Sequence, residues 1–331
     1  MKRQLMTRTM LSVSLGFALM ACSQGQNFSL PSQSNNFGQN IIYNNKVDVI
    51  FVVDNSSGMD QVNANWRAAV PTLVNSLLGQ KLDLHMAVVT SSMGGTNPNG
   101  GKFLGSPKFF TSKTSNLAST VTQRISEVGT DGSDLERGLD SLSRVLKPSY
   151  QTGEGAGFLR EDALLAVISL STEDDKSSDF SGSAGFAAYL DQIKGAYDDG
   201  TRRWTLNFIG ILSLSGSCAT VPEMNYREPG VRWLDLAALS NGVTASICST
   251  DLSGAAKNIR ARIAQIITDF KLSKIPDLAT LKVYLNGKLI PRSNENGWDY
   301  IPERNVVRFY GSAIPSADAD IRIDFTPASA N

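Results

Sequence analysis

The stretch VDVIFVVD, residues 47–54, is a near-continuous apolar run that ends in an aspartate. Runs of this kind are typical of strands that are buried on both faces of a parallel sheet. Similar runs follow at LDLHMAVVT (82–90), ALLAVISLS (163–171) and RWTLNFIGILS (203–213). The sequence therefore predicts a set of central parallel strands, of which residues 47–53 form the first.

Apolar residues recur at helical spacing between these runs. A short edge strand, interrupted by Pro107, is expected in the stretch GKFLGSPKFF, residues 101–110. Strands that alternate with helices predict a doubly wound, mostly parallel, Rossmann-like α/β sheet. The helical stripes are Trp66, Val70, Leu73 and Leu77; Leu135, Leu139, Leu142 and Leu146; Trp233, Leu236 and Leu239; and Ile259, Ile263, Ile266, Ile267 and Phe270.

The pattern changes after Phe270. The stretch TLKVYLNGKLIPRS, residues 280–293, contains two alternating runs joined by Asn286-Gly287, which is a strong hairpin signal. Further short alternating runs follow, so we expect a small all-β module over residues 272–328. Nothing in this module has the pattern of a catalytic or binding site, and a packing or spacer role is the simpler interpretation.

The N-terminus has the features of an export signal. Three basic residues precede an apolar run from Met10 to Ala21, which is too short to span a bilayer. The run ends in LMAC, which resembles the bacterial lipobox, so Cys22 is expected to be lipidated after removal of residues 1–21. An ordinary secretory signal is the alternative. The absence of Asp at position 23 favours the outer membrane, on either face, and residues 22–44 are expected to be a flexible tether.

Composition excludes several classes of protein. The chain has 331 residues, 41% of them hydrophobic, and 31 basic residues balance 31 acidic ones. This apolar content argues against disorder, and the lack of a basic surplus argues against a nucleic-acid partner. One histidine, His85, and three cysteines leave too few ligands for a zinc site built from His and Cys. If Cys22 carries lipid, Cys218 and Cys248 remain as a pair that export would favour bonding.

Because ligands of such sheets bind beyond the carboxyl ends of the strands, the loops after Val53 and Leu170 are the candidate site. The first loop reads FVVDNSSGM, residues 51–59. It resembles the opening Asp-x-Ser-x-Ser motif of the von Willebrand factor A (VWA) domain, and the order of strands and helices extends this resemblance over about residues 45–271. The chain is similar to VWA lipoproteins of predatory and gliding bacteria.

The resemblance implies a metal-ion-dependent adhesion site (MIDAS), in which oxygens from three loops hold a divalent cation and an acidic group of the partner completes its coordination. Asp54 matches the aspartate and Ser56 the first serine, while Gly58 replaces the second serine. Alternate side chains of an extended loop face the same way, so Asp54 and Ser56 can reach one ion. Hard cations such as Mg2+ prefer these oxygen ligands.

The other two loops depart further from the pattern. Either Thr130 or Ser133 can supply the hydroxyl of the second loop, and we favour Thr130, because Ser133 can instead cap a helix with Glu136 three residues later. The third loop has Thr172 where the family has aspartate. The acidic residues that follow can take part in metal binding or form a solvated loop; those closest to the expected ligand are Glu173 and Asp174.

These features predict a lipid-anchored binding protein or adhesin that captures a protein or glycan through a MIDAS-like face, with Mg2+ as the expected cation. A VWA domain that has lost its metal stays open. The alternative is a structural lipoprotein that scaffolds other envelope proteins without metal. An enzyme is not expected, because the sequence has no HExxH motif, no Ser/His/Asp order and no phosphate-binding loop ending in Gly-Lys-Ser/Thr.

Overall fold

The computed structural model describes residues 37–42, 44–60, 62–94, 99–133, 135–197, 200–218, 227–315 and 319–328. The expected signal peptide, Cys22 and most of the expected tether therefore lie outside the described residues. Within the described part of the chain, no helix is both long enough and apolar enough to cross a membrane.

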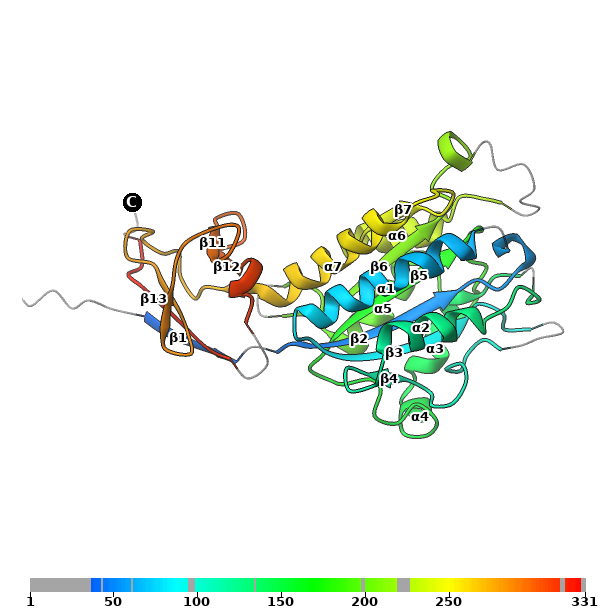
Figure 1. Ribbon diagram of the computed structural model, residues 1–331, viewed down its shortest axis with the longest axis horizontal. Helices are drawn as coiled ribbons and strands as arrows, with labels where there is room; N and C mark the ends of the chain where they lie inside the picture. Colours follow the sequence, from blue (N-terminus) through cyan, green and yellow to red (C-terminus); the bar gives the residue numbers. More distant parts are fainter. Residues whose placement is uncertain are drawn as a thin grey trace, which may run out of the picture. The chain divides into compact units, whose positions relative to one another are not determined.

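A six-stranded sheet with the order β4-β3-β2-β5-β6-β7 forms the centre of the α/β part (Figure 1). Its strands pair in parallel except β4, which pairs antiparallel with β3 at one edge. The predicted mostly parallel sheet is thus confirmed. The strands are β2 (Lys46–Val53), β3 (Asp83–Thr90), β4 (Phe110–Thr111), β5 (Leu164–Ser171), β6 (Trp204–Gly210) and β7 (Thr244–Ser246).

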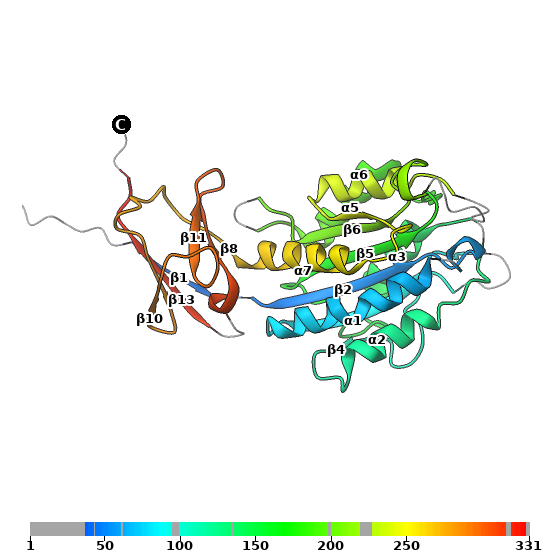
Figure 2. The same cartoon turned by 45° about the horizontal axis from the view of Figure 1, so that its top comes forward.

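Helices cover both faces of this sheet because alternate side chains of the buried strands point to opposite sides. Val49 and Phe51 belong to the core under α1, α2 and α7, whereas Ile50 and Val52 belong to the core under α3, α5 and α6. Figure 2 shows the helices packed against the sheet. The first group is α1 (Asn63–Gly79), α2 (Leu117–Ser126) and α7 (Ser253–Thr268); the second is α3 (Gly138–Leu146), α5 (Gly182–Lys194) and α6 (Val231–Leu239), with the short α4 (Pro148–Gln151) after α3.

The strand order places a topological switch point beside β2. From β2 the chain continues to β3 on one side, and β5 pairs with β2 on the other side. Val53 is in register with both Thr90 and Leu170, so the residues that follow these three strands emerge together at one edge of the sheet. Open α/β sheets bind ligands at this kind of position.

The strands from β8 onward form two antiparallel sheets, as expected for an all-β module. The turn between β9 and β10 has positive φ at Asn286 (50°) and Gly287 (76°), which is the geometry that favours this pair in two-residue hairpins. One sheet has the order β1-β13-β9-β10 and the other β11-β12-β8. The strands are β1 (Phe37–Ile42), β8 (Asp269–Lys271), β9 (Lys282–Leu285), β10 (Lys288–Ile290), β11 (Trp298–Ile301), β12 (Val306–Phe309) and β13 (Asp320–Phe325).

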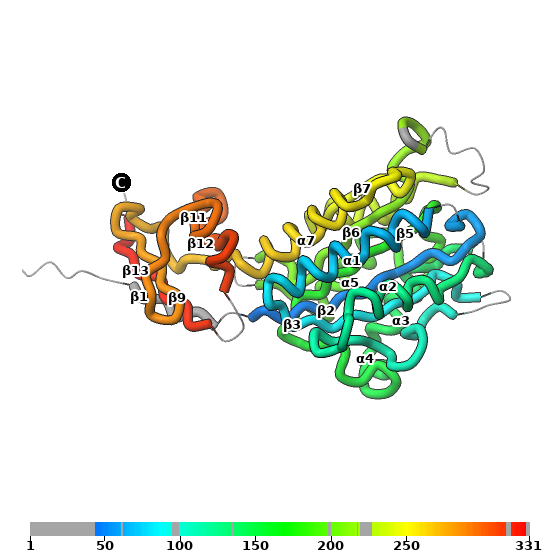
Figure 3. The backbone as a smooth tube through the Cα atoms, viewed as in Figure 1, coloured from blue at the N-terminus to red at the C-terminus, as the bar shows by residue number. Residues whose placement is uncertain are grey.

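Two boundaries differ from the expected ones. Residues 37–42 were assigned to the tether, but they form β1, which pairs with β13 from Phe37↔Phe325 to Ile42↔Asp320 (Figure 3). Backbone hydrogen bonds hold these two strands together, and the polar side-chain composition of the segment does not indicate whether such bonds form. Residues 269–271, assigned to the α/β domain, form β8, which follows α7 directly and pairs with β12 in the second sheet. The stripe of α7 therefore ends before Phe270.

A buried ionic cluster fixes the segment that leads into β5. The Arg160 backbone N–H and Nε donate to the two oxygens of Asp48, at 2.7 and 2.8 Å. Lys194 Nζ donates to the carbonyl oxygens of Arg160 and Glu161 at 2.5 and 3.2 Å. Burial raises the pKa of Asp48 and lowers the pKa of Lys194 to about 8.

Candidate functional site

Asp54 is held rigidly at the switch point. Its backbone N–H donates to Leu170 O at 2.9 Å, and its side chain is almost fully buried. One carboxylate oxygen accepts the Ser56 N–H at 2.8 Å; the other accepts the Ser171 hydroxyl at 2.7 Å and the Thr172 N–H at 3.3 Å. These bonds tie the first and third loops to one carboxylate and fix its orientation.

Hydroxyl oxygens beside Asp54 are buried without a partner. Ser56 Oγ and Thr172 Oγ1 have no hydrogen-bond partner among the described residues, and the Ser91 hydroxyl lies beside the Glu136 carboxyl. Ser91 follows β3, and its N–H donates to Val53 O at 3.3 Å, so it lies next to the start of the first loop. Buried hydroxyls are normally hydrogen-bonded, so unpartnered ones at one place indicate a ligand that supplies the missing interaction.

Glu136 is a site residue that the sequence analysis did not identify. It forms an isolated β-bridge with Ser92, and its side chain is buried close to the side chains of Ser91 and Asp54. Burial, with a smaller contribution from the charge of Asp54, raises its pKa to about 10. The carboxyl of Glu136 therefore faces Asp54 in a site that strongly favours the neutral form of Glu136.

The second loop places its two expected hydroxyls differently. Thr130 lines a cavity of about 140 Å3 between α1 and α2, together with Asp60 and Arg67. Ser133 lies nearer the strand ends, because its N–H donates to Ser92 Oγ at 2.7 Å. Its own Oγ accepts the Leu135 N–H at 3.1 Å, and α3 begins only at Gly138, so Ser133 does not cap that helix.

The acidic residues of the third loop divide into two roles. Asp174 Oδ1 accepts the Arg232 N–H at 2.8 Å in the first turn of α6, and Asp175 Oδ2 accepts the Leu139 N–H at 3.0 Å in the first turn of α3. Both therefore satisfy helix N-termini. Glu173 is 5% exposed and its charge also raises the pKa of Glu136, so it is the member of this group that lies near Glu136.

Asn55, in the first loop, packs closely against Gly132 of the second loop. It is fully buried, and its carbonyl accepts the Gly132 N–H at 2.7 Å. A Cβ on Gly132 would lie 2.4 Å from Asn55 Cγ, so only glycine permits this approach. Gly58 lies in the 3-10 turn η1 (Ser57–Met59) that begins directly after Ser56. A hydroxyl is therefore missing at the position of the second serine, as expected.

These donors fit a hard divalent cation. Asp54 is an oriented carboxylate, Ser56 and Thr172 offer hydroxyl oxygens, and Glu136 offers a second carboxyl group, all at the carboxyl ends of the strands or in the loop that crosses them. Oxygen-only sets of this kind suit Mg2+ or Ca2+. Among the described residues, no three His, Cys, Asp or Glu side chains group as a metal site by themselves, so a cation here would need the hydroxyls as well.

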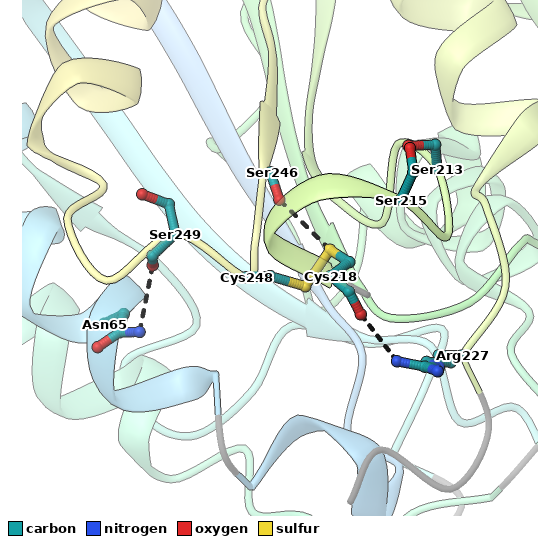
Figure 4. The surroundings of a disulfide bond; sticks show 8 residues. All are labelled: Asn65, Ser213, Ser215, Cys218, Arg227, Ser246, Cys248 and Ser249. Carbon is teal, nitrogen blue, oxygen red and sulfur yellow. Dashed lines mark hydrogen bonds between the residues drawn. A yellow bond between two sulfur atoms is a disulfide. The ribbon is translucent and has the colours of Figure 1, made fainter. Parts of the chain in front are cut away.

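Long loops surround this edge of the sheet. The loop after β3 returns with Gly100 N–H donating to Ser92 O at 2.7 Å, although residues 95–98 lie outside the described part. The loop after β6 contains the 3-10 turn η2 (Gly216–Cys218), and residues 219–226, with Tyr226, are not described. Cys218 and Cys248 form a disulfide, as predicted, and Arg227 Nη1 donates to Cys218 O at 2.7 Å (Figure 4).

Comparison with known proteins gives no family assignment. No protein-family model and no curated protein matches the chain. A crystal form of proximal thread matrix protein 1 from the mussel byssus is similar, with 14% identity, a TM-score of 0.43, and coverage of 71% of this chain and 51% of that one. The pilus adhesin SpaC from Lactobacillus rhamnosus GG gives 12% identity, a TM-score of 0.41, and coverage of 87% and 40%. The chain spans about half the length of these proteins or less, and such scores assign neither fold family nor function.

Proposed function

We propose that this chain is a lipid-anchored envelope binding protein of the VWA type, which captures a protein or glycan ligand through a cation-centred face. The observation that carries the proposal is the set of buried oxygens at the switch point. Asp54 is oriented there, the hydroxyl oxygens of Ser56 and Thr172 are buried without partners, and the Glu136 carboxyl is buried beside Asp54. The proposed role is binding without catalysis.

A divalent cation at this position would offer an open coordination site to a carboxylate or hydroxyl oxygen of the ligand. Asp54 would hold the ion directly, since its contacts with Ser171 and Thr172 already fix its orientation. Ser56 Oγ and Thr172 Oγ1, which lack hydrogen-bond partners, would bind the cation as ligands. Glu136 would supply the carboxylate that the resemblance places at position 172, but from the loop before α3.

Metal binding by itself tests the site. The full chain, stripped with EDTA, is titrated with Mg2+ while its melting temperature and heat of binding are followed. A ligand that binds only the native state stabilises it by RT ln(1 + [L]/Kd), so the melting temperature keeps rising with the Mg2+ concentration above Kd. We expect Ser56→Ala and Glu136→Gln each to weaken Mg2+ affinity by about tenfold or more, roughly 1.4 kcal/mol. Ser57→Ala is the matched control, because Ser57 is the exposed neighbour of Ser56.

A carboxylate exchange tests the role of Glu136 more sharply. The double variant Glu136→Gln with Thr172→Asp moves the second carboxylate to the position expected from the resemblance. We expect it to regain most of the Mg2+ affinity that Glu136→Gln loses. Equal Mg2+ affinity in wild type, Ser56→Ala and Glu136→Gln would refute a cation at this site.

Ligand capture is tested with a glycan array and with intact bacterial cells as probes. We expect binding of the full chain to be lost in EDTA and in Asp54→Asn, which keeps the size of the side chain but removes its charge. Binding that survives both changes would contradict the cation-dependent mechanism. Stable co-purification with one envelope protein in EDTA would instead support the scaffolding alternative.

A further inference from the structure

A second site lies at the opposite end of the α/β sheet. A cavity of about 520 Å3 opens beside the segment before β6, the end of α6 and the last turns of α7, and its lining includes Arg202, Arg262 and Arg304. Because β6 is parallel to β5, residues before β6 lie at the edge away from Asp54 and Thr172. This volume is within the range of small-ligand sites, roughly 300–1,000 Å3.

Two of the three arginines have acidic partners. Arg202 Nε and Nη2 donate to the two oxygens of Asp191 at 2.9 and 3.2 Å. Arg304, in the turn between β11 and β12, pairs with Asp269. Asp269 is shared, because it also accepts two hydrogen bonds from Arg308 at 2.5 and 2.8 Å. One carboxylate thus serves two guanidinium groups, which leaves a surplus of positive charge beside the cavity.

Arg262 has only neutral partners in the described structure. Its Nη1 donates to Gln265 Oε1 at 3.2 Å and its Nη2 to Ser240 O at 3.0 Å, while its Nε is buried without a hydrogen-bond partner. Burial, and then the charge of Arg304, lower the pKa of Arg262. Arg262 makes no direct ion pair in the described structure, although the charge of Asp269 partly opposes this lowering of its pKa. A partly buried guanidinium without a direct ion pair is costly, and an anion in the adjacent cavity would offset that cost.

Helix capping explains part of this arrangement. Arg202 Nη1 donates to Leu239 O at 2.6 Å and Arg262 contacts Ser240 O, so both satisfy carbonyl groups at the end of α6. Capping does not account for the unpartnered Nε of Arg262, for the hollow beside it, or for the third arginine that faces the same hollow. Planar guanidinium groups match tetrahedral oxyanions through paired hydrogen bonds.

We propose that this cavity binds a phosphate-type oxyanion, with Arg262 as the principal contact and Arg202 and Arg304 at its sides. The anion is either free in solution or carried as the headgroup of an acidic phospholipid. The site shares no residue with the proposed cation site, so EDTA and Asp54→Asn are expected to leave anion binding unchanged.

The test measures the melting temperature of the full chain in rising inorganic phosphate, against sodium chloride at equal ionic strength. We expect phosphate to raise the wild-type melting temperature and to bind with a calorimetric Kd that Arg262→Gln weakens at least about tenfold. Arg260→Gln is the matched control, since Arg260 lies on the same helix but does not line the cavity. Arg262→Lys keeps the positive charge but removes the guanidinium group, and it replaces Arg262→Gln in this measurement if Arg262→Gln does not fold.

Vesicles distinguish the two sources of the anion. Co-sedimentation of wild type, but not Arg262→Gln or Arg262→Lys, with phosphatidylglycerol vesicles and not with phosphatidylcholine vesicles would identify a lipid headgroup. A phosphate effect without vesicle binding would identify a free anion. A phosphate effect no larger than that of chloride, with no vesicle binding, would overturn the proposal. So would lower melting temperatures in both Arg262 variants with an unchanged phosphate shift, because that result indicates capping alone.

Discussion

The second carboxyl group of the candidate site belongs to Glu136 and not to the residue at position 172. The resemblance places a carboxylate at position 172, but the chain has a threonine there, and a buried carboxyl group faces Asp54 from Glu136 instead. Asp54, Ser56 and Thr172 could be proposed from sequence because the resemblance to VWA domains places ligand positions at these residues, in the loops after two buried strands. Glu136 could not, since neither periodicity nor strand position predicts where a side chain of an irregular loop points.

Lys194 gives the clearest pH dependence at the residue scale. Its pKa is lowered in the folded protein to about 8 from an ordinary 10.5, because it is buried. The unfolded chain therefore binds more protons between these values, and stability rises with pH across this window. This gain in stability is lost as the pH falls from 10.5 to 8, and below 8 Lys194 is protonated in both states and contributes no further change. We expect the free energy of unfolding of wild type, relative to Lys194→Met, to increase by up to about 3 kcal/mol from pH 8 to 10.5.

Denaturant unfolding of both proteins at a series of pH values measures this difference. Comparison with Lys194→Met removes the contributions of other groups that titrate in the same range, including Glu136. A constant difference between the two proteins across the window would show that Lys194 has the same pKa in the folded and unfolded chains.

At the scale of elements, the acidic loop after β5 acts through the helices next to it. Asp174 and Asp175 accept backbone N–H groups in the first turns of α6 and α3, so one loop fixes two helix starts beside the site. The sequence interpretation of this loop as either metal ligands or solvated charge missed this role. Capping from a distant loop is a tertiary contact, and local sequence patterns identify only caps that lie next to their helix.

The disulfide is the element-scale feature with the largest expected energy. Cys218 and Cys248 are 30 residues apart in sequence, and closing a loop of this length stabilises a fold by about 3.5 kcal/mol in the chain-entropy estimate. We expect the double variant Cys218→Ser with Cys248→Ser to lose about this much in denaturant unfolding, and to bind its ligand less well because the loop after β6 is less ordered. Unchanged stability, with the disulfide shown to be formed in wild type by thiol titration, would contradict this.

At the scale of the whole molecule, much of the architecture was predictable. The continuous apolar runs predicted the parallel strands and Asn286-Gly287 predicted a hairpin, because burial and turn geometry act locally on these residues. The pairing of β1 with β13 was not predictable, since it joins residues almost 290 positions apart through backbone groups. The proposed anion site was missed for the same reason, because its arginines come from separate parts of the chain.

Asp269 is the shared acidic partner of two arginines in the β module. Its side chain is 2% exposed and pairs with both Arg304 and Arg308. We expect Asp269→Asn to lower the free energy of unfolding by about 3–5 kcal/mol, because two arginines then lose their buried counter-ion. Asp299→Asn is the matched control: its pair with Arg292 is largely exposed, and we expect a loss below about 1 kcal/mol. Similar losses in the two variants by urea unfolding would refute this account.

The place of β13 in its sheet has a consequence for how the chain is made. β13 lies between β1 and β9, so β1, the first strand of the described structure, cannot pair until β13, which ends at Phe325, has been synthesised. Domains tend to fold in order as they leave the ribosome. The strands and helices from β2 to α7 can assemble while synthesis continues, but this sheet cannot close until its last strand has emerged. A stop codon before Asp320 would therefore remove the shared partner of β1 and β9 and leave unpaired backbone groups along both strands. Exposed strand edges of this kind promote aggregation, although only the last strand of the sheet is lost.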